Sequence, residues 1–310
     1  MRFGIALESF TPPGKNPDVQ EVFKIAELAE SLGFDSVWAW DHILLGSRKV
    51  FPVLDAPTLL SAIGARTTRV NLGTSVLVMA HRNPIVLAKV LSTIQYFTRG
   101  RLIVGAGAGW YEKEFRATGA DFSNRGKTFE RRFDLVKRLL NQSDLSYNQD
   151  GFVLEHASME PRILEKIPML VGGYSDCVLE RAGRIGDGWI AYYYTAQGFH
   201  DSWRKVNSSA ASNGRDPASL RAVNIVPLSI GKDYAEGDRV AREFTSRYMD
   251  LPKNTGCTVE SSIRGTIQEC AEQIRKYEDA GVEDLVFIPA NYSIEIVERA
   301  GKELLPSFLK

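Results

Sequence analysis

The sequence predicts an α/β protein with the architecture of a (β/α)8 TIM barrel. Eight short apolar segments alternate along the chain with longer amphipathic segments. The apolar segments are hydrophobic throughout rather than at every second residue, which is typical of parallel strands covered by helices. No glycine-rich dinucleotide fingerprint follows the first of them, which leaves the open doubly wound sheet as the less favoured alternative. Because such barrels span ~200 to over 400 residues, we expect a single domain over residues 1–310.

The predicted strands are rich in valine, isoleucine and leucine, as expected for strands buried on both faces. In chain order they are Arg2–Glu8, Ser36–Asp41, Asn71–Met79, Leu102–Gly107, Ile167–Gly173, Gly188–Tyr193, Val223–Ile230 and Asp284–Pro289.

The segments between the strands carry the start and stop signals of helices. Pro17-Asp18 precedes the first, in which Val22, Ile25 and Ala26 recur at helical spacing until Gly33. The other predicted helices run from Asn83-Pro84 to Phe97 and over Thr128–Leu140, Cys177–Ile185, Gln197–Ala211, Thr266–Ala280 and Ser293–Leu309.

Three connections are longer than a minimal barrel requires. They are Ala108–Lys127, Asn141–Lys166 with a hairpin-like turn at Asn148–Gly151, and Asp233–Ile263. Active sites of barrels lie at the carboxyl ends of the strands, where long loops commonly carry function. We therefore predict insertions at the C-terminal face of the barrel.

The composition excludes several classes of partner. Lys plus Arg and Asp plus Glu each number 38, so no overall charge favours nucleic acid or an anionic membrane surface. No run of ~18 apolar residues and no signal-peptide pattern occurs, so we expect a cytoplasmic protein without membrane spans. The three cysteines have neither metal-site nor disulfide-framework spacing, and we expect no metal.

Titratable residues stand at the predicted strand ends. Glu8 closes the first strand, Asp41 and His42 close the second, and His81 follows the third. A histidine at such a position can donate or accept a proton near neutral pH, so we predict a catalytic role for Asp41 and His42. The alternative for each histidine is a structural hydrogen bond.

Two glycine-rich segments follow the fourth and fifth strands. The segment 172–175 leads directly into a predicted helix, so its open N–H groups and a serine hydroxyl could hold a phosphate. The segment 105–110 would let the backbone approach a flat ring, with a tryptophan as a wall. The alternatives are a tight strand-to-helix joint and a glycine-rich barrel corner. The residues assigned to a cofactor site are Gly107, Gly109, Trp110, Gly172, Gly173, Tyr174 and Ser175.

Together these segments resemble the luciferase-like monooxygenase and deazaflavin-dependent oxidoreductase superfamily. The resemblance covers nearly the whole chain in order. The segments that carry it are DSVWAWDH (35–42), LGTSVLVMAHRNPIVLAKVLSTIQYFTRGRLIVGAGAGW (72–110), EKEFRATGADFSNRGKTFERR (112–132), VGGYSDCVLERAGRIGDGW (171–189) and GVEDLVFIP (281–289).

The resemblance implies a flavin-type ring at the carboxyl-terminal mouth of the barrel. Asp41 and His42 would lie beside the ring, with Glu8 also at the cofactor site. Ser75 and Val76 would form a bulge with a non-prolyl cis peptide that supports the ring's face. The turn 172–175 would take the phosphate.

The resemblance leaves more than one activity open. We expect hydride transfer with the deazaflavin coenzyme F420 to or from a small organic substrate. The alternative is an FMN-dependent monooxygenase that receives reduced FMN from a separate flavin or F420 reductase. A flavin-binding barrel without catalytic activity is a minor alternative. In each case the ring carries the redox chemistry, and the protein supplies orientation and exclusion of water.

The substrate cannot be identified from the sequence beyond the character of its pocket. Several aromatic residues indicate an apolar, aromatic-lined site, although some of them, Trp203 above all, could equally belong to the core. These residues are Trp40, Tyr192, Tyr193, Tyr194 and Trp203. We also expect a homodimer.

Overall fold

The computed structural model describes residues 1–46, 48–248 and 258–308. Eight parallel strands form a closed ring, because β10 pairs with β11 as well as with β9. Around the ring the order is β1, β2, β5, β6, β9, β10, β11 and β13. The predicted (β/α)8 barrel is therefore confirmed.

All eight predicted strands occur, with ends that differ by at most two residues from the predicted ones. The barrel strands are β1 (Arg2–Ala6), β2 (Ser36–Ala39), β5 (Asn71–Val78), β6 (Leu102–Gly107), β9 (Met169–Gly172), β10 (Gly188–Tyr192), β11 (Arg221–Ile230) and β13 (Asp284–Pro289). A short strand, β12 (Ile263–Gly265), adds to β11 outside the ring.

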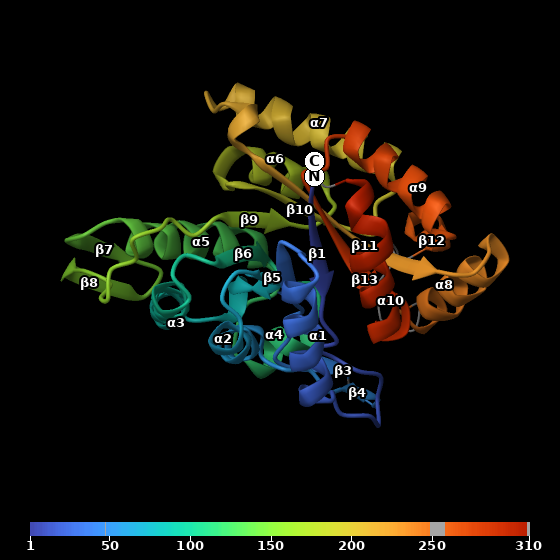
Figure 1. Cartoon of the computed structure of the whole chain (residues 1–310). Helices are drawn as coiled ribbons and strands as arrows, with labels where there is room; N and C mark the ends of the chain where they lie inside the picture. Colours follow the sequence, from blue (N-terminus) through green and yellow to red (C-terminus); the bar gives the residue numbers. More distant parts are fainter. Residues whose placement is uncertain (47, 249–257, 309–310) are drawn as a thin grey trace.

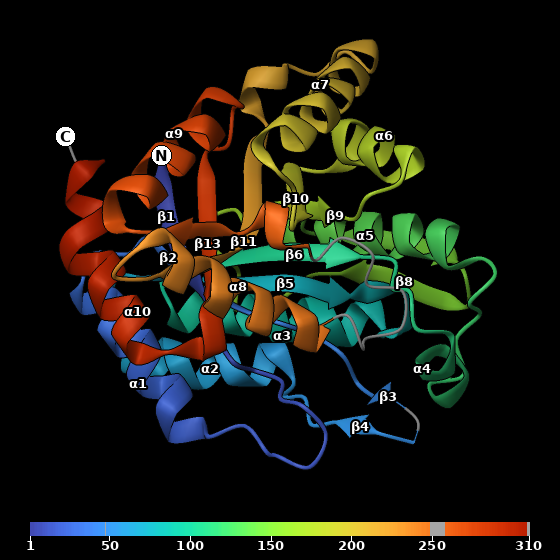
Figure 2. The same ribbon diagram turned by 90° about the vertical axis from the view of Figure 1, so that its right-hand side faces the viewer.

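Helices surround the strands, with α6 and α7 on one side of the barrel and α1, α2 and α3 on the opposite side (Figure 2). The helices are α1 (Val19–Ser31), α2 (Ala56–Arg66), α3 (Pro84–Phe97), α4 (Glu112–Ala117), α5 (Arg125–Asn141), α6 (Asp176–Ile185), α7 (Ala196–Ser212), α8 (Tyr234–Tyr248), α9 (Ile267–Asp279) and α10 (Ile294–Arg299). No helix in the described ranges is long and apolar enough to cross a membrane.

Side-chain caps are present at the starts of several predicted helices. Asp18 accepts hydrogen bonds from the first turn of α1, and Asn83 does the same for α3. Thr266 and Glu269 form a reciprocal capping box at α9. The last predicted helix, Ser293–Leu309, is broken: α10 continues as a π-helical turn and a 3-10 turn to residue 307, and residue 309 lies outside the described residues.

Three helices were not predicted. Helix α2 begins after Asp55, whose carboxylate accepts from Thr58 N, and Pro57 lies in its first turn, so a recognisable start signal was overlooked. Helix α4 has only six residues, too few to show a periodic pattern. Helix α8 lies in the predicted long segment 233–263, of which residues 249–257 are outside the described part of the chain.

The lengthened connections lie at both ends of the barrel, not only at the predicted C-terminal face. The hairpin of β7 (Leu145–Gln149) and β8 (Phe152–Ala157) has the expected turn but follows α5, which runs back to the amino ends of the strands. Gln95 binds the Glu165 carbonyl beyond this hairpin and also the first residue of β6. The hairpin is therefore at the amino-terminal end, and Figure 1 shows it far from α8 and from the unpredicted hairpin β3 (Leu45–Gly46)–β4 (Val50–Phe51).

The interior of the barrel is filled by side chains that lie over glycines. A Cβ atom on Gly73 would lie 2.2 Å from the Trp38 ring, and one on Gly4 would lie 3.0 Å from its Nε1. The indole therefore occupies the space that glycine leaves on the strands to either side of β2. Trp189 is equally buried but points outward, where its ring stacks on Phe199 of α7 at 5.1 Å.

Candidate active site

Strand β5 bends at the mouth of the barrel. The peptide bond between Ser75 and Val76 is cis, and the pairing with β6 shifts register between Thr74 and Leu77. The Ser75 hydroxyl donates to the Ala39 carbonyl of β2 at 3.1 Å, which fixes the bend. The predicted bulge and its non-prolyl cis peptide are both confirmed.

The Val76 side chain points between two of the predicted site glycines. A Cβ atom on Gly107 would lie 2.9 Å from Val76 Cγ2, and one on Gly172 would lie 2.7 Å from Val76 Cγ1. Neither strand therefore has room for a side chain at this level. Packing against Val76 explains these glycines directly, and their contact with a cofactor stays a prediction.

Gly109 also has a structural reason. Its φ of 82° lies in the left-handed region, and a Cβ atom there would lie 2.6 Å from Val78 and 2.8 Å from Phe115. The carbonyl of Gly109 accepts from Arg125 at 3.1 Å. This turn brings Trp110 to His42, with ring centroids 5.6 Å apart and planes at 85°.

His42 is held by a carboxylate that the sequence analysis did not single out. His42 Nδ1 lies 3.0 Å from Oε2 of Glu114, which belongs to α4 and is 1% exposed. The other oxygen, Oε1, accepts from the backbone N–H groups of Ile43 and Leu44. A buried glutamate thus fixes both the imidazole and the chain after β2.

The charge of Glu114 follows from its contacts. Burial alone would raise the pKa of this carboxyl, but contacts with His42 and His81 and backbone N–H groups outweigh it and hold the pKa well below its usual range. An ionised Glu114 can only accept hydrogen bonds, so Nδ1 of His42 must carry a proton. His42 Nε2 makes no hydrogen bond within the described residues, and the side chain is 14% exposed, so this nitrogen is available at the mouth.

His81 is the second imidazole beside Glu114. Its Nε2 lies 3.5 Å from Oε2, but neither ring nitrogen forms a hydrogen bond of normal geometry with the described residues. The side chain is fully buried and packs edge-on against Phe115 at 5.2 Å. His81 is therefore a buried neighbour of Glu114 and is shielded from solvent.

Asp41 has protein partners on both oxygens. Oδ2 accepts from Val78 N at 2.9 Å, and Oδ1 accepts from Arg82 at 2.6 Å. The residue is 3% exposed, and Arg82 also pairs with Asp55 at 3.0 Å. These bonds tie the end of β2 to the end of β5. They give Asp41 a positioning role, whereas its direct participation in catalysis stays a prediction.

Glu8 stands at the carboxyl end of β1, as predicted. Burial raises the pKa of this carboxyl above its usual value, and Lys15 only partly opposes the shift. A carboxyl in such surroundings can hold a proton at a higher pH than a solvated one. Its assignment to the cofactor site stays a prediction.

The turn from β9 into α6 has the features of an anion site. Gly173 has a φ of 137°, and its carbonyl accepts from Trp189 Nε1 at 3.0 Å. Ser175 is the N-cap of α6, yet its hydroxyl caps no N–H group and only touches Cys177 Sγ at 3.1 Å. Val178 N and Leu179 N donate to the Ser175 carbonyl, which leaves the N–H groups of Asp176 and Cys177 for a ligand phosphate, and the hydroxyl could exchange its contact with Cys177 for the same phosphate. Tyr174 is 49% exposed beside them.

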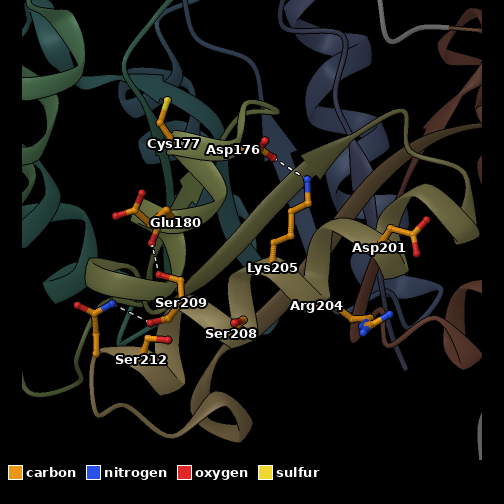
Figure 3. A pocket seen from close by; sticks show the side chains of 10 residues that line it. Asp176, Cys177, Glu180, Asp201, Arg204, Lys205, Ser208, Ser209 and Ser212 are labelled. Atoms are coloured by element: carbon orange, nitrogen blue, oxygen red, sulfur yellow. Dashed lines mark hydrogen bonds and ion pairs between the residues drawn. The ribbon is translucent and has the colours of Figure 1, made fainter.

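A groove between α6 and α7 borders this turn (Figure 3). Its lining is of mixed charge, with Asp176 and Glu180 on α6 and Arg204 and Lys205 on α7, and Figure 3 shows Lys205 pointing toward Asp176. Lys205 pairs with Asp176 at 2.7 Å, which offsets the acidic side chain in the first turn of α6. In the described residues no group of three or more histidine, cysteine, aspartate or glutamate side chains could hold a metal ion.

Glu114 could have been found from one signal. It lies in the segment 108–127, which was recognised as longer than a minimal barrel needs, and it directly precedes the buried Phe115. A glutamate on the apolar side of a short helix requires a partner. The partner itself, 72 residues away along the chain, leaves no trace in the local pattern.

Known proteins resemble this chain in sequence and in structure. The sequence matches the luciferase-like monooxygenase family over residues 1–284. It is 30% identical over 308 residues to an F420-dependent glucose-6-phosphate dehydrogenase of Intrasporangium calvum, covering 90% of this chain and 91% of that enzyme.

Two solved structures have the same fold at low identity. A monooxygenase of Streptomyces bottropensis superposes with a TM-score of 0.83 at 21% identity and covers 100% of both chains. An F420-dependent secondary alcohol dehydrogenase in complex with an F420-acetone adduct superposes with a TM-score of 0.83 at 18% identity, covering 100% of this chain and 99% of that one.

Proposed function

The chain belongs to the luciferase-like monooxygenase family, and from this premise we propose that it transfers a hydride between coenzyme F420 and a small organic substrate. The observation that carries the proposal is the His42–Glu114 pair at the mouth. Hydride transfer to or from a carbon that bears oxygen also requires a proton to be given to or taken from that oxygen. His42 Nε2 is placed for this step because Glu114 fixes the other nitrogen.

The residues around the mouth fit a flavin-type cofactor. The open hydroxyl of Ser175 and the first turn of α6 would hold its phosphate, and the bend at Val76 would support the ring. When bound, the deazaflavin supplies the carbon that gives or accepts the hydride. His42 moves the proton, and Trp110 packs against the His42 imidazole. Asp41 holds the end of β2 to the end of β5.

The relatives support the choice of F420 over FMN. The dehydrogenase of Intrasporangium calvum is named for F420 and aligns over nearly the whole chain. The alternative is an FMN-dependent monooxygenase served by a separate reductase. It stays a second candidate because the fold is equally similar to that of the Streptomyces bottropensis monooxygenase. The phosphate turn does not discriminate between the two because both cofactors carry a phosphate.

Titration of the purified protein with F420, FMN and FAD tests the proposal. We expect F420 to bind at least ~10-fold more tightly than FMN, a difference of about 1.4 kcal/mol. The reverse order, together with oxygen consumption in the presence of reduced FMN, would support the monooxygenase. Weak binding of all three would contradict both activities. Tight binding of one of them without any turnover would instead favour the non-catalytic flavin-binding barrel.

The phosphate turn is tested by Ser175→Ala. A hydroxyl bound to a charged group typically contributes ~1.5–3 kcal/mol, so we expect F420 affinity to fall ~10-fold or more. Ser208→Ala is the matched control, because Ser208 lies in the adjoining groove on α7 but outside the turn. Equal effects of both variants would place the phosphate elsewhere.

We also propose that the protein is a cytoplasmic homodimer. The outer side of α3 exposes Val86, Val90 and Phe97, an apolar surface suited to a second copy. Sedimentation velocity of the wild type and of Val86→Glu measures this directly, with a shift to monomer expected in the variant. A wild type that sediments as a monomer contradicts the dimer.

A further inference from the structure

Two aromatic rings meet across the mouth of the barrel. Trp40 follows β2 and Tyr192 ends β10, and these strands are four places apart in the ring of eight, on opposite sides. The ring centroids nevertheless lie 5.7 Å apart, with planes inclined at 33°. The two side chains therefore form an aromatic bridge, Trp40–Tyr192, over the centre of the barrel.

The alternation of side chains along each strand confirms that the bridge faces inward. Trp38 fills the interior beside Gly73, and Trp40 is two residues further along the chain, directly after the last residue of β2. Ile190 Cδ1 would lie 3.2 Å from a Cβ atom on Gly105, so it also points inward, and Tyr192 is two residues further on β10. The bridge is thus the layer above the packed interior, at the carboxyl ends of the strands.

Each ring of the bridge carries a buried polar atom without a partner. Trp40 Nε1 and Tyr192 Oη are both shielded from solvent, and neither forms a hydrogen bond within the described ranges. Tyr192 is 8% exposed. Buried polar groups are almost always paired in native proteins, so two unpaired ones on touching rings indicate a ligand position.

The chemistry of the two atoms selects an acceptor. An indole N–H can only donate, and burial raises the pKa of Tyr192 well above its usual value, so the phenol stays protonated and can donate too. The neighbouring side chains are aromatic: Phe10 packs edge-on to Trp40 at 6.0 Å, and Tyr174 lies 6.4 Å from Tyr192. These surroundings suit an uncharged, planar apolar group that bears one oxygen.

We propose that the N–H of Trp40 and the O–H of Tyr192 bind the carbonyl oxygen of an uncharged aromatic or alicyclic aldehyde or ketone. This inference rests on the proposed function for the position of the hydride donor. In the reduction, the hydride adds to the carbonyl carbon, and the π pair of the C=O bond moves to the oxygen. The two donors stabilise the resulting negative charge. One proton from His42 completes the alcohol, and the reductant is the reduced deazaflavin.

A matched pair of probes tests the site without cofactor or turnover. 2-Acetylnaphthalene carries a carbonyl oxygen, and 2-ethylnaphthalene has nearly the same shape without it. We expect the wild type to bind the ketone ~10-fold more tightly than the hydrocarbon, as quenching of tryptophan fluorescence or calorimetry would measure. Tyr192→Phe and Trp40→Phe should each reduce this preference to less than ~3-fold.

Thermal unfolding of the same variants supplies an independent readout. Tyr192→Phe removes a hydroxyl that has no partner, so its Tm should stay unchanged or rise. Tyr277→Phe is the control, because this buried hydroxyl donates to the Tyr194 carbonyl at 2.9 Å. The control should lower Tm and keep the ketone preference. Absence of a preference in the wild type, or its persistence in Tyr192→Phe, overturns the inference.

Titration with F420 separates this inference from the proposed function. We expect both bridge variants to bind F420 within ~2-fold of the wild type, since the bridge contacts substrate. A loss of F420 affinity with an unchanged ketone preference would mean that the bridge binds the cofactor, which overturns the inference alone. A wild type that prefers the ketone but binds no F420 would instead refute the proposed function and leave the carbonyl site standing.

Discussion

The two ends of the barrel each bury a carboxylate, with different partners. At the amino-terminal end, Asp284 at the start of β13 receives two hydrogen bonds from Arg2 of β1 and two from Arg221 of β11, all between 2.7 and 2.8 Å. At the mouth, Glu114 is paired with His42 and contacts His81. Both carboxylates are 1% exposed.

The partners decide what each cluster can do. Arginine remains charged at every physiological pH, so Asp284 is always paired with two cations, and the cluster clamps three neighbouring strands. Histidine exchanges protons near neutral pH, so the cluster around Glu114 can change its protonation during a reaction. A buried carboxylate therefore stabilises the fold at the amino-terminal end, and we propose that at the mouth it serves chemistry, as is expected of the two ends of a barrel.

Removing His42 should produce the largest effect. Loss of a positioned acid–base group typically costs ~10²–10³ in rate, so His42→Ala should lower kcat by that factor while Tm changes little. His156→Ala is the control. His156 is an 81% exposed histidine of the β7–β8 hairpin, far from the mouth at the amino-terminal end of the barrel, and pairs with Asp144. If kcat of His42→Ala stayed within ~3-fold of wild type, the mouth cluster would be as structural as the basal one.

Neutralising Asp284 should lower stability and leave kcat unchanged, the opposite of the result expected for His42→Ala. Asp284→Asn leaves Arg221 and Arg2 without their shared counter-charge, and breaking a buried pair typically costs ~3 kcal/mol or more. The free energy of unfolding in urea should fall by this amount, with kcat unchanged at temperatures where the variant is folded. A loss of kcat without a loss of stability would erase the distinction between the two ends.

Glu114→Gln should give an intermediate effect that is sensitive to pH. The amide no longer requires a proton on His42 Nδ1, so the tautomer of the imidazole is released, and we expect kcat to fall roughly 10-fold, with a changed pH–rate profile. An unaltered profile would mean that Glu114 does not orient His42.

The pH dependence of protein stability tests the lowered pKa of Glu114. The folded protein holds the pKa of Glu114 below its usual value. The ionised carboxylate therefore adds to the free energy of unfolding above pH ~4.3, and this stabilisation is lost as the pH falls through the folded-state pKa. The wild type should therefore lose more stability than Glu114→Gln when the pH is lowered below ~4.3. Parallel curves for the two proteins would contradict the lowered pKa.

Glu8→Gln should show the smallest effect, a gain in stability at neutral pH rather than a loss. The pKa of Glu8 is raised by burial, so the ionised carboxylate costs stability at neutral pH, and this cost disappears as pH falls below ~4.3. The variant should be more stable than wild type at pH 7 by less than ~1 kcal/mol, and the gain should vanish at low pH. Urea unfolding at the two pH values measures both, and a destabilised variant at pH 7 would refute the raised pKa.

The fold was largely predictable from local signals, and the site was predictable only in part. Continuous apolar segments identified all eight barrel strands, and the caps Asp18 and Asn83 identified the starts of α1 and α3. The short helix α4 was missed because six residues carry no periodic signal. The face of the β7–β8 hairpin was misjudged although it follows a predicted helix, and a helix of such a barrel returns the chain to the amino ends of the strands. The bend at Val76 came from the family resemblance and not from any propensity.

The sequence by itself determined the barrel, the position of His42 at a strand end and the open turn at Ser175, because each depends on residues within a few positions of one another. Only the tertiary structure decided that Glu114 holds His42 and that Trp40 meets Tyr192. Closing eight strands into a ring brings their carboxyl ends to one rim, so residues far apart in the chain become neighbours. Such contacts depend on strand order and tilt, which no local pattern contains.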